Sequence, residues 1–331
     1  MKKTVSAFDI GGSYHKVARW VGNKILVETI QMPENLINDG MIQMPNVLSD
    51  LLKEVKLEHH IPTGPCGVTI PETVTVCRSV SLPAMTEAQL EVNLPFEFTD
   101  YISKDPQRYV YDYAVQDIIC DEDGKPIELS LIAAVMGKEE VTGYIKIFKN
   151  GKFKLKTLIP EEIALGNLMK KALAEGRIVK EKEYCMINLG HHSTQVYIYR
   201  GANQIVLRNL HLGNDLVDKA ISENKNIDEF LARTYKNSNH QNILKEEYCQ
   251  NVFTKIAIEI MKVINFYRFN NRESVLEDIY FFGGGSNIED LCNTIAETNS
   301  LNSKSFMELM PKEVDKDANP NSVFAIGTLM Q

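Results

Sequence analysis

Two related stretches open the two halves of the chain: FDIGGSYHK at residues 8–16 and INLGHHSTQ at residues 187–195. Matching positions lie 179 residues apart without a gap, as at 9 and 188, 11 and 190, 17 and 196, and 22 and 201. In each copy an apolar strand runs into a polar turn that contains glycine, and two more strands follow across a second glycine turn. The repeat predicts a duplicated pair of lobes, each beginning with a three-stranded meander that carries one special turn.

Apolar periodicity and turn residues predict the remaining elements. Helices are expected at about 45–57, 86–98, 138–148, 161–175, 215–223, 227–235, 244–270 and 323–330, and another begins near 288. Strands are expected at 67–70, 74–81, 108–116, 128–136 and 279–282. Residues 82–151 are predicted to form a small α+β insert after the first meander, and residues 299–321 a polar, loop-rich segment.

The composition excludes several classes of protein. At 331 residues with 44% hydrophobic and 24% charged residues, the chain is long enough for about two domains with cores of their own. A net charge of -8 argues against binding to the nucleic-acid backbone. We expect neither a signal peptide nor a membrane-spanning segment, because the start is polar and no apolar run approaches the necessary length. The six cysteines show no metal-ligand spacing and indicate reduced thiols in a cytoplasmic protein.

The first special turn combines groups that suit a phosphate. Asp9 ends a buried strand, where a carboxylate is costly unless it meets a cation or hydrogen-bond donors. Gly11 and Gly12 allow backbone N–H groups to approach a ligand, Ser13 adds a hydroxyl, and Lys16 adds a positive charge. A carboxylate beside a phosphate cradle favours Mg²⁺. The alternative interpretation is a plain hairpin with a surface lysine.

The second turn has Asn188 where the first has an aspartate, followed by Gly190, His191, His192 and Ser193. It offers backbone N–H groups, hydroxyls and two imidazoles. Adjacent histidines rarely chelate one ion and no third ligand is apparent, so solvent-exposed turn histidines are the favoured interpretation over a metal site.

A third candidate is the glycine turn at 283–286, between a buried strand and a helix. Such a turn lets an anion or a flat ring lie against bare backbone. On the long helix before it, Glu259 and Lys262 share a face, and their alternative role is a simple surface ion pair. The Rossmann, P-loop, G-x-S-x-G and H-E-x-x-H motifs are all absent from the sequence.

Together, the two turns, the glycine turn and the closing Ala325-Ile326-Gly327-Thr328 resemble the motifs of the actin-like ATPase superfamily. The resemblance implies an α/β fold, namely the actin-like (ribonuclease H-like) two-lobe ATPase fold. A closer resemblance is to the PilM family, cytoplasmic FtsA-related proteins of type IV pilus assembly. It rests on residues 39–42, 78–86, 97, 112–113, 131–135 and 208–213.

The PilM resemblance implies four subdomains. They are 1A at 1–81 and 152–180, the FtsA/PilM-type 1C at 82–151, 2A at 181–222 and 271–331, and 2B at 223–270.

The resemblance also implies a site for ATP or ADP with Mg²⁺ between the two lobes. Asp9 would bind Mg²⁺ through water. The nucleotide would be held by Asp9, Gly11, Gly12, Ser13, Lys16, Asn188, Gly190, Ser193, Gly213, Glu259, Lys262, Gly284, Gly285 and Ser286. Glu161, at the start of a helix, is the candidate for positioning the attacking water.

The departures from the family pattern concern hydrolysis. Asn188 replaces the usual aspartate of the second motif, so the site loses a negative charge and a base. The common Gly-Gly pair after Arg208 is here Gly213-Asn214. Because phosphoryl transfer depends on positioning and charge stabilisation, we expect nucleotide binding with weak or no hydrolysis.

The expected function is an assembly scaffold. The resemblance implies that a groove between subdomains 1A and 1C binds the short cytoplasmic tail of PilN, an inner-membrane protein, and thereby recruits the chain to the membrane. Pilus motor ATPases and self-association are further expected partners, without nucleic acid and without direct membrane insertion. Two alternatives are a small-molecule kinase of the superfamily and an FtsA-like filament former. A type II secretion-like system is the alternative to a pilus.

Overall fold

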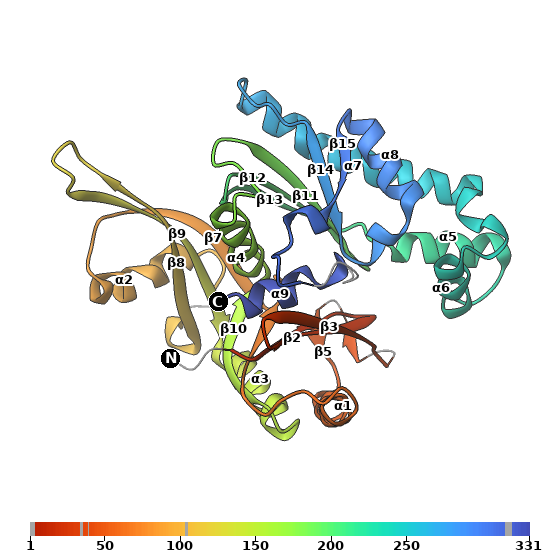
Figure 1. Cartoon of the computed structure of the whole chain (residues 1–331), viewed down its shortest axis with the longest axis horizontal. Coiled ribbons are helices and arrows are strands. Elements are labelled where there is room, and N and C mark those ends of the chain that lie inside the picture. The colour runs from red at the N-terminus through yellow and green to blue at the C-terminus, as the bar shows by residue number, and fades with distance from the viewer. Residues whose placement is uncertain (1–3, 34–35, 39, 103–104, 315–319) are drawn as a thin grey trace. The chain divides into compact units, whose positions relative to one another are not determined.

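The computed structural model describes residues 4–33, 36–38, 40–102, 105–314 and 320–331 (Figure 1). Asp39, one of the residues behind the family resemblance, lies outside them, as do residues 1–3 and 315–319 of the predicted subdomains. The chain divides into two compact units. The first comprises Met1–Leu168, Glu313–Asp315 and Phe324–Gln331, and the second comprises Met169–Lys312 and Lys316–Val323.

The first unit is built on a five-stranded sheet in the order β10-β6-β1-β2-β3. Its strands are β1 (Ser6–Ile10), β2 (Tyr14–Val21), β3 (Lys24–Gln31), β6 (Pro65–Ile70) and β10 (Lys154–Pro160). The predicted meander pairs antiparallel, whereas β6 joins β1 and β10 in parallel. Helices α1 (Pro45–Glu58) and α3 (Lys138–Asn150) bury Leu48, Leu52 and Phe148 in one apolar core with Phe8 and Val68 of the sheet.

The predicted insert is a three-stranded antiparallel sheet in the order β7-β9-β8. The elements are β7 (Thr75–Pro83), α2 (Glu87–Asn93), the 3-10 helices η1 (Leu94–Phe98) and η2 (Pro106–Arg108), β8 (Tyr109–Cys120) and β9 (Pro126–Gly137). Thr86 and Gln89 form the capping box that starts α2. The single helix expected at 86–98 instead changes to 3-10 geometry at Leu94, where Pro95 lacks the N–H that an α-helix needs. A two-stranded ribbon of β4 (Ile37–Asn38) and β5 (Met41–Ile42) was not predicted.

The second unit repeats the first sheet in the order β13-β12-β11-β14-β15. The strands are β11 (Glu183–Leu189), β12 (Thr194–Arg200), β13 (Asn203–Leu210), β14 (Asp278–Phe282) and β15 (Asn302–Ser305). As in the first unit, a meander is followed by two strands that pair in parallel. The 179-residue repeat is therefore a repeat of sheet topology, and β15 adds a strand within the segment expected to be loop.

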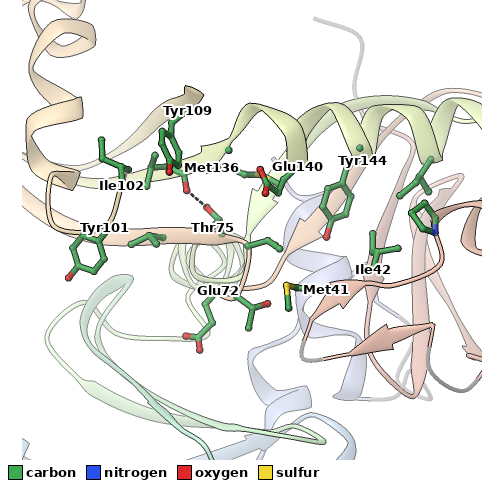
Figure 2. A pocket seen from close by; sticks show the side chains of 18 residues that line it. Met41, Ile42, Glu72, Thr75, Tyr101, Ile102, Tyr109, Met136, Glu140 and Tyr144 are labelled. Atoms are coloured by element: carbon green, nitrogen blue, oxygen red, sulfur yellow. Dashed lines mark hydrogen bonds between the residues drawn. The ribbon is translucent and has the colours of Figure 1, made fainter. Parts of the chain in front are cut away.

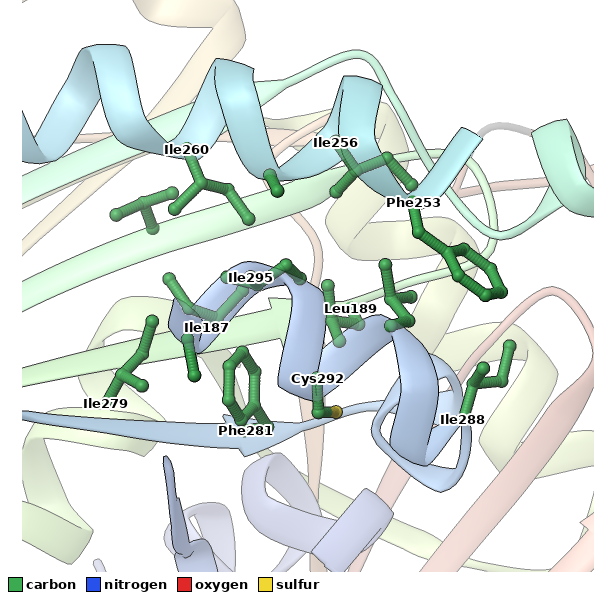
Figure 3. Close-up of a cluster of buried hydrophobic side chains, with 14 of the residues drawn as sticks. Ile187, Leu189, Phe253, Ile256, Ile260, Ile279, Phe281, Ile288, Cys292 and Ile295 are labelled. Atoms are coloured by element: carbon green, nitrogen blue, oxygen red, sulfur yellow. The ribbon is translucent and has the colours of Figure 1, made fainter. Parts of the chain in front are cut away.

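The helices of the second unit lie outside this repeat. They are α5 (Asp215–Lys225), α6 (Glu229–Ser238), η3 (His240–Lys245), α7 (Glu247–Asn270), η4 (Gly284–Asn287), α8 (Glu289–Asn299), η5 (Phe306–Leu309) and η6 (Pro320–Ser322). Helix α7 points Phe253, Ile256 and Ile260 into a core that includes Leu189 of β11 and Ile295 of α8 (Figure 3). Apolar burial therefore holds helix α7 on the second unit, as the 3.6-residue spacing of its apolar side chains predicted.

Helix α4 (Glu161–Ala174) begins in the first unit and crosses its boundary with the second at Leu168. Helix α9 (Val323–Leu329) groups with the first unit from Phe324 onward, where the Thr328 hydroxyl lies 2.8 Å from that of Thr69 on β6. The division places 324–331 apart from the rest of predicted subdomain 2A, and the four subdomain boundaries stay a prediction.

Candidate functional site

The first turn joins β1 to β2 through the pairing of Asp9 with Lys16. The Lys16 ammonium lies 3.3 Å from the Asp9 carboxylate, and the backbone N–H of Gly11 donates to the carbonyl of Tyr14 at 3.1 Å. Asp9 is almost fully buried, so the cation beside it offsets part of the cost of removing a carboxylate from water. The turn therefore presents a carboxylate, an ammonium and backbone amides together, as the sequence predicted.

The second turn has the same backbone geometry with a different pair of side chains. Gly190 donates to the carbonyl of Ser193 at 3.0 Å, matching the bond of the first turn 179 residues earlier. Asn188 and Gln195 occupy the positions of the Asp9–Lys16 pair, and their amide groups hydrogen bond at 2.8 Å. An ion pair in the first copy is thus a neutral amide pair in the second.

The glycine turn packs directly on the second turn, within the second unit. A Cβ atom on Gly283, whose φ is +83°, would lie 2.2 Å from the Asn188 side-chain oxygen. One on Gly285 would lie 2.4 Å from the amide nitrogen of Asn214, which itself donates to the carbonyl of Leu189 at 3.1 Å. The structure therefore brings the two elements together, and larger residues would separate them.

Gly213 completes this cluster. A Cβ atom there would lie 2.1 Å from the carbonyl oxygen of His191, so the backbone after β13 touches the second turn itself. The following Asn214 and Asp215 donate their backbone N–H groups to Gly190 and His191 at 3.1 and 2.9 Å. A glycine is required at position 213 because the backbone there lies so close to the backbone of His191. The predicted contact of Gly213 with a phosphate is a separate question and remains a prediction.

The two turn histidines differ from each other. His192 is exposed as predicted, and its Nδ1 lies 3.5 Å from the Asp215 carboxylate. His191 is not solvent-exposed: its ring is partly buried and its Nε2 lies 3.2 Å from Arg233. Burial, reinforced by His192 and Arg233, lowers the pKa of His191 to about 3. The imidazole is therefore neutral, and the expectation of two exposed histidines is wrong for His191.

Glu259 and Lys262 form an ion pair of 2.6 Å on α7. The lysine side chain is 62% exposed, and the pair lies off the helix face that carries Phe253 and Ile260 into the core. The two residues therefore form a surface ion pair, which was the alternative interpretation of the sequence. A contact of either residue with a nucleotide remains a prediction.

Glu161 begins α4, and the neighbouring Glu162 is the residue that sequence reasoning missed. Glu162 is 4% exposed, and burial raises its pKa. The thiol of Cys77 lies close to this carboxyl group, and burial together with the nearby Glu162 raises the pKa of Cys77. The spacing of Glu162 to the buried Leu165 and Met169 is helical, and this periodicity was the available signal that it points inward.

A pocket of about 440 Å³ lies within the first unit, between β5, β7, β9 and α3 (Figure 2). Its walls are mainly apolar and aromatic, with Tyr101 and Tyr109 at one end and Met41, Ile42 and Tyr144 at the other (Figure 2). Among its lining residues in the described chain, only Glu72 and Glu140 are charged. None of these residues was predicted individually, because they converge from segments up to about 100 residues apart.

Comparison with known proteins identifies the family. The family model for the type IV pilus assembly protein PilM matches residues 22–319. This chain belongs to the PilM family. No curated protein sequence matches it.

Solved structures agree with the PilM assignment on the fold. The structure of a PilM-PilN type IV pilus biogenesis complex matches with a TM-score of 0.84 and 20% identity, over 99% of this chain and 98% of that one. The ethanolamine utilization protein EutJ from Carboxydothermus hydrogenoformans matches with a TM-score of 0.60, 13% identity, and coverage of 98% and 89%. MreB5 of Spiroplasma citri bound to ADP matches with a TM-score of 0.52, 12% identity, and coverage of 99% and 95%. The actin-like fold predicted for this PilM-family chain is confirmed.

Among the described residues, none of the PilM-family chain's helices is long and apolar enough to cross a membrane. In the same part of the chain, no three or more His, Cys, Asp or Glu side chains gather as a metal site would need.

Proposed function

We propose that this PilM-family assembly protein captures the cytoplasmic tail of a PilN-like membrane protein in the pocket of its first unit. The single observation that carries the proposal is the pocket itself, which has a volume of about 440 Å³ and is lined by apolar groups and tyrosines. A solved PilM protein of the same fold occurs in complex with PilN. Short peptides commonly bind such grooves through apolar anchors. A partner of this kind would recruit the chain to the inner face of the membrane.

The charges of the pocket narrow the chemistry of the tail. Glu72 and Glu140 both lie at the pocket, and no basic residue lines it within the described chain. Complementary potentials favour a tail that combines apolar anchors with at least one lysine, arginine or free amino group.

Reversing the charge of Glu140 tests this assignment. With a synthetic peptide of the PilN-like tail from the same organism, Glu140→Lys is expected to weaken binding at least about tenfold, or 1.4 kcal/mol. The matched control is Glu139→Lys, because Glu139 is the exposed neighbour that pairs with Arg108 outside the pocket. Fluorescence anisotropy measures both. Equal affinities for the two variants would exclude the pocket as the binding site.

We also propose that the chain binds ATP or ADP with Mg²⁺, and that within each unit the glycine-containing turns supply backbone amides for its phosphates. The residues fit the group: Asp9 and Lys16 lie together, and a Cβ atom on Gly12 or Gly284 would meet no atom within 4 Å, so space is open beside the backbone amides. A protein of the same fold, MreB5, binds ADP. When bound, the nucleotide would supply phosphates to these amides, and Asp9 would orient the water shell of the metal.

Calorimetry with ATP and Mg²⁺ tests this site. Asp9→Ala is expected to lower the affinity at least about tenfold, because it removes the carboxylate proposed to orient the water shell of the metal. Asp50→Ala, on the exposed face of α1, is the control and should leave the affinity unchanged. Unchanged affinity in Asp9→Ala would remove Asp9 from this role.

Hydrolysis is proposed to be weak or absent. Asn188 has no carboxylate and its amide already donates to Gln195, so position 188 offers neither a carboxylate base nor a second negative charge for the metal. Turnover of purified protein at about 1 s⁻¹ or faster, typical of kinases, together with its loss in Asn188→Ala, would overturn this proposal. The family match supports assembly over the kinase and filament alternatives, and motor ATPases and self-association stay predictions.

A further inference from the structure

A buried ion pair joins helices α5 and α6 in the second unit. The Lys236 ammonium lies 2.8 and 2.9 Å from the two carboxylate oxygens of Asp218, and the side chains are 7% and 1% exposed. Burial raises the pKa of Asp218 and lowers that of Lys236, and each partner partly offsets the shift of the other. A buried pair of this kind often adds little net stability, because the desolvation cost is large. The other contacts of Lys236 and Asp218 therefore indicate a role besides stability.

Lys236 also holds the chain that supports the second turn. Its ammonium donates to the carbonyl of Asn214 at 3.3 Å. Asn214 in turn donates its backbone N–H to Gly190 and its side-chain amide to Leu189, both at 3.1 Å. A continuous path of hydrogen bonds thus leads from α6 to the backbone of the turn.

A second path runs through Arg233, one turn earlier on α6. Its Nε lies 3.6 Å from Asp218, and its Nη2 lies 3.2 Å from Nε2 of His191. A guanidinium only donates, so Nε2 must accept and the imidazole proton must sit on Nδ1. Arg233 therefore fixes both the orientation and the tautomer of a side chain within the turn.

We propose that Asp218 is a positioning residue for the second turn, acting through Lys236 on the turn's backbone and through Arg233 on His191. This inference rests on the proposed binding of a nucleotide by that turn. The Asp218 carboxylate contacts Lys236 and Arg233 and acts on the second turn through them. It holds two cations of α6 in place, and those cations hold the turn in the shape that presents its amides.

Three substitutions test the two paths. Asp218→Asn keeps the shape of the side chain but removes its charge, Arg233→Lys keeps the charge but removes the fork, and Lys236→Met removes the backbone contact. Lys245→Met is the control, since it breaks the exposed pair with Asp290 in the same unit. We expect at least tenfold weaker ATP·Mg²⁺ binding by calorimetry for the first three and no change for the control.

Nuclear magnetic resonance of the imidazole nitrogens gives a readout that needs no nucleotide. The signals of His191 are assigned by their loss in His191→Gln, and wild-type protein is expected to show the Nδ1–H tautomer. Asp218→Asn and Arg233→Lys should shift these signals toward a mixture of tautomers, and Lys245→Met should not. Wild-type signals in both variants would overturn the proposal, as would unchanged nucleotide affinity in all three.

The failure of the proposed nucleotide site is distinguishable from this result. If wild-type protein binds no ATP or ADP, the nucleotide proposal falls, and the His191 signals alone then support or overturn the positioning role. If Lys236→Met does not fold, the near-isosteric Asp218→Asn still tests the same carboxylate.

Discussion

Replacing Gly213 with valine is expected to lower the free energy of unfolding by roughly 3 kcal/mol, at the upper end of overpacking effects. The reason is the 2.1 Å that separates a Cβ atom at this position from the carbonyl oxygen of His191. That neighbour is backbone, held by the bond from the Asp215 N–H, and cannot rotate away as a side chain would. The turn must move or the strand end must retreat, and either change breaks the bonds of Asn214.

Urea unfolding followed by circular dichroism measures the loss, and hydrogen exchange of peptides from β11 and β12 locates it. Gly143→Ala is the matched control, because a Cβ atom on Gly143 of α3 meets nothing within 4 Å and alanine favours helix. It should leave stability unchanged or raise it slightly. A Gly213→Val protein as stable as wild type, with unchanged exchange in β11, would contradict the close packing at this point.

The second large effect concerns acid. His15 on β2 is fully buried against Phe8, and burial, aided by Lys16, lowers its pKa to about 3. In the unfolded chain a histidine titrates near 6.5, so below that pH the unfolded state binds a proton that the folded state refuses. Above pH 6.5 the residue costs nothing. As the pH falls from 6.5 toward 3, it removes about 1.4 kcal/mol of stability per pH unit, or roughly 2.7 kcal/mol at pH 4.5.

Trp20, the chain's one tryptophan, lies on the same strand and reports the unfolding of this region. Urea unfolding between pH 4.5 and 7.5 should show His15→Leu gaining on wild type as the pH falls. Val17→Ala is the control, because it creates a small defect on the same strand without changing a titrating group, and its difference from wild type should be constant. A difference for His15→Leu that does not change with pH would mean that the imidazole binds a proton equally well in the folded and unfolded states, and would contradict the lowered pKa.

Much of the fold follows from local sequence patterns. The meanders, their glycine turns and most helices depend on alternation, helical spacing and turn chemistry, which act over a few residues. The 179-residue offset also makes positions 16 and 195 equivalent. That offset places Gln195 opposite Asn188, as Lys16 lies opposite Asp9, so the replacement of an ion pair by an amide pair was visible in the sequence.

Other features depend on contacts between distant segments. The change of helix type at Leu94 had a local cause in Pro95, whereas the burial of Glu162 against Cys77 joins residues 85 positions apart. No local pattern specifies which strand a helix covers, because the apolar faces of many elements are interchangeable in size and hydrophobicity.

The duplicated sheets, the residue types of the three turns and membership of the PilM family follow from the sequence alone, because each rests on short motifs or on their order. The packing of Gly213 and Gly283 against the second turn follows only from the folded structure, as do the two glutamates at the mainly apolar pocket of the first unit. The same holds for Asp218, a buried carboxylate that pairs with Lys236 and Arg233 of α6. These arrangements depend on which side chains meet when helices and strands pack, and packing is settled by the shape of the whole unit and not by neighbours in the chain.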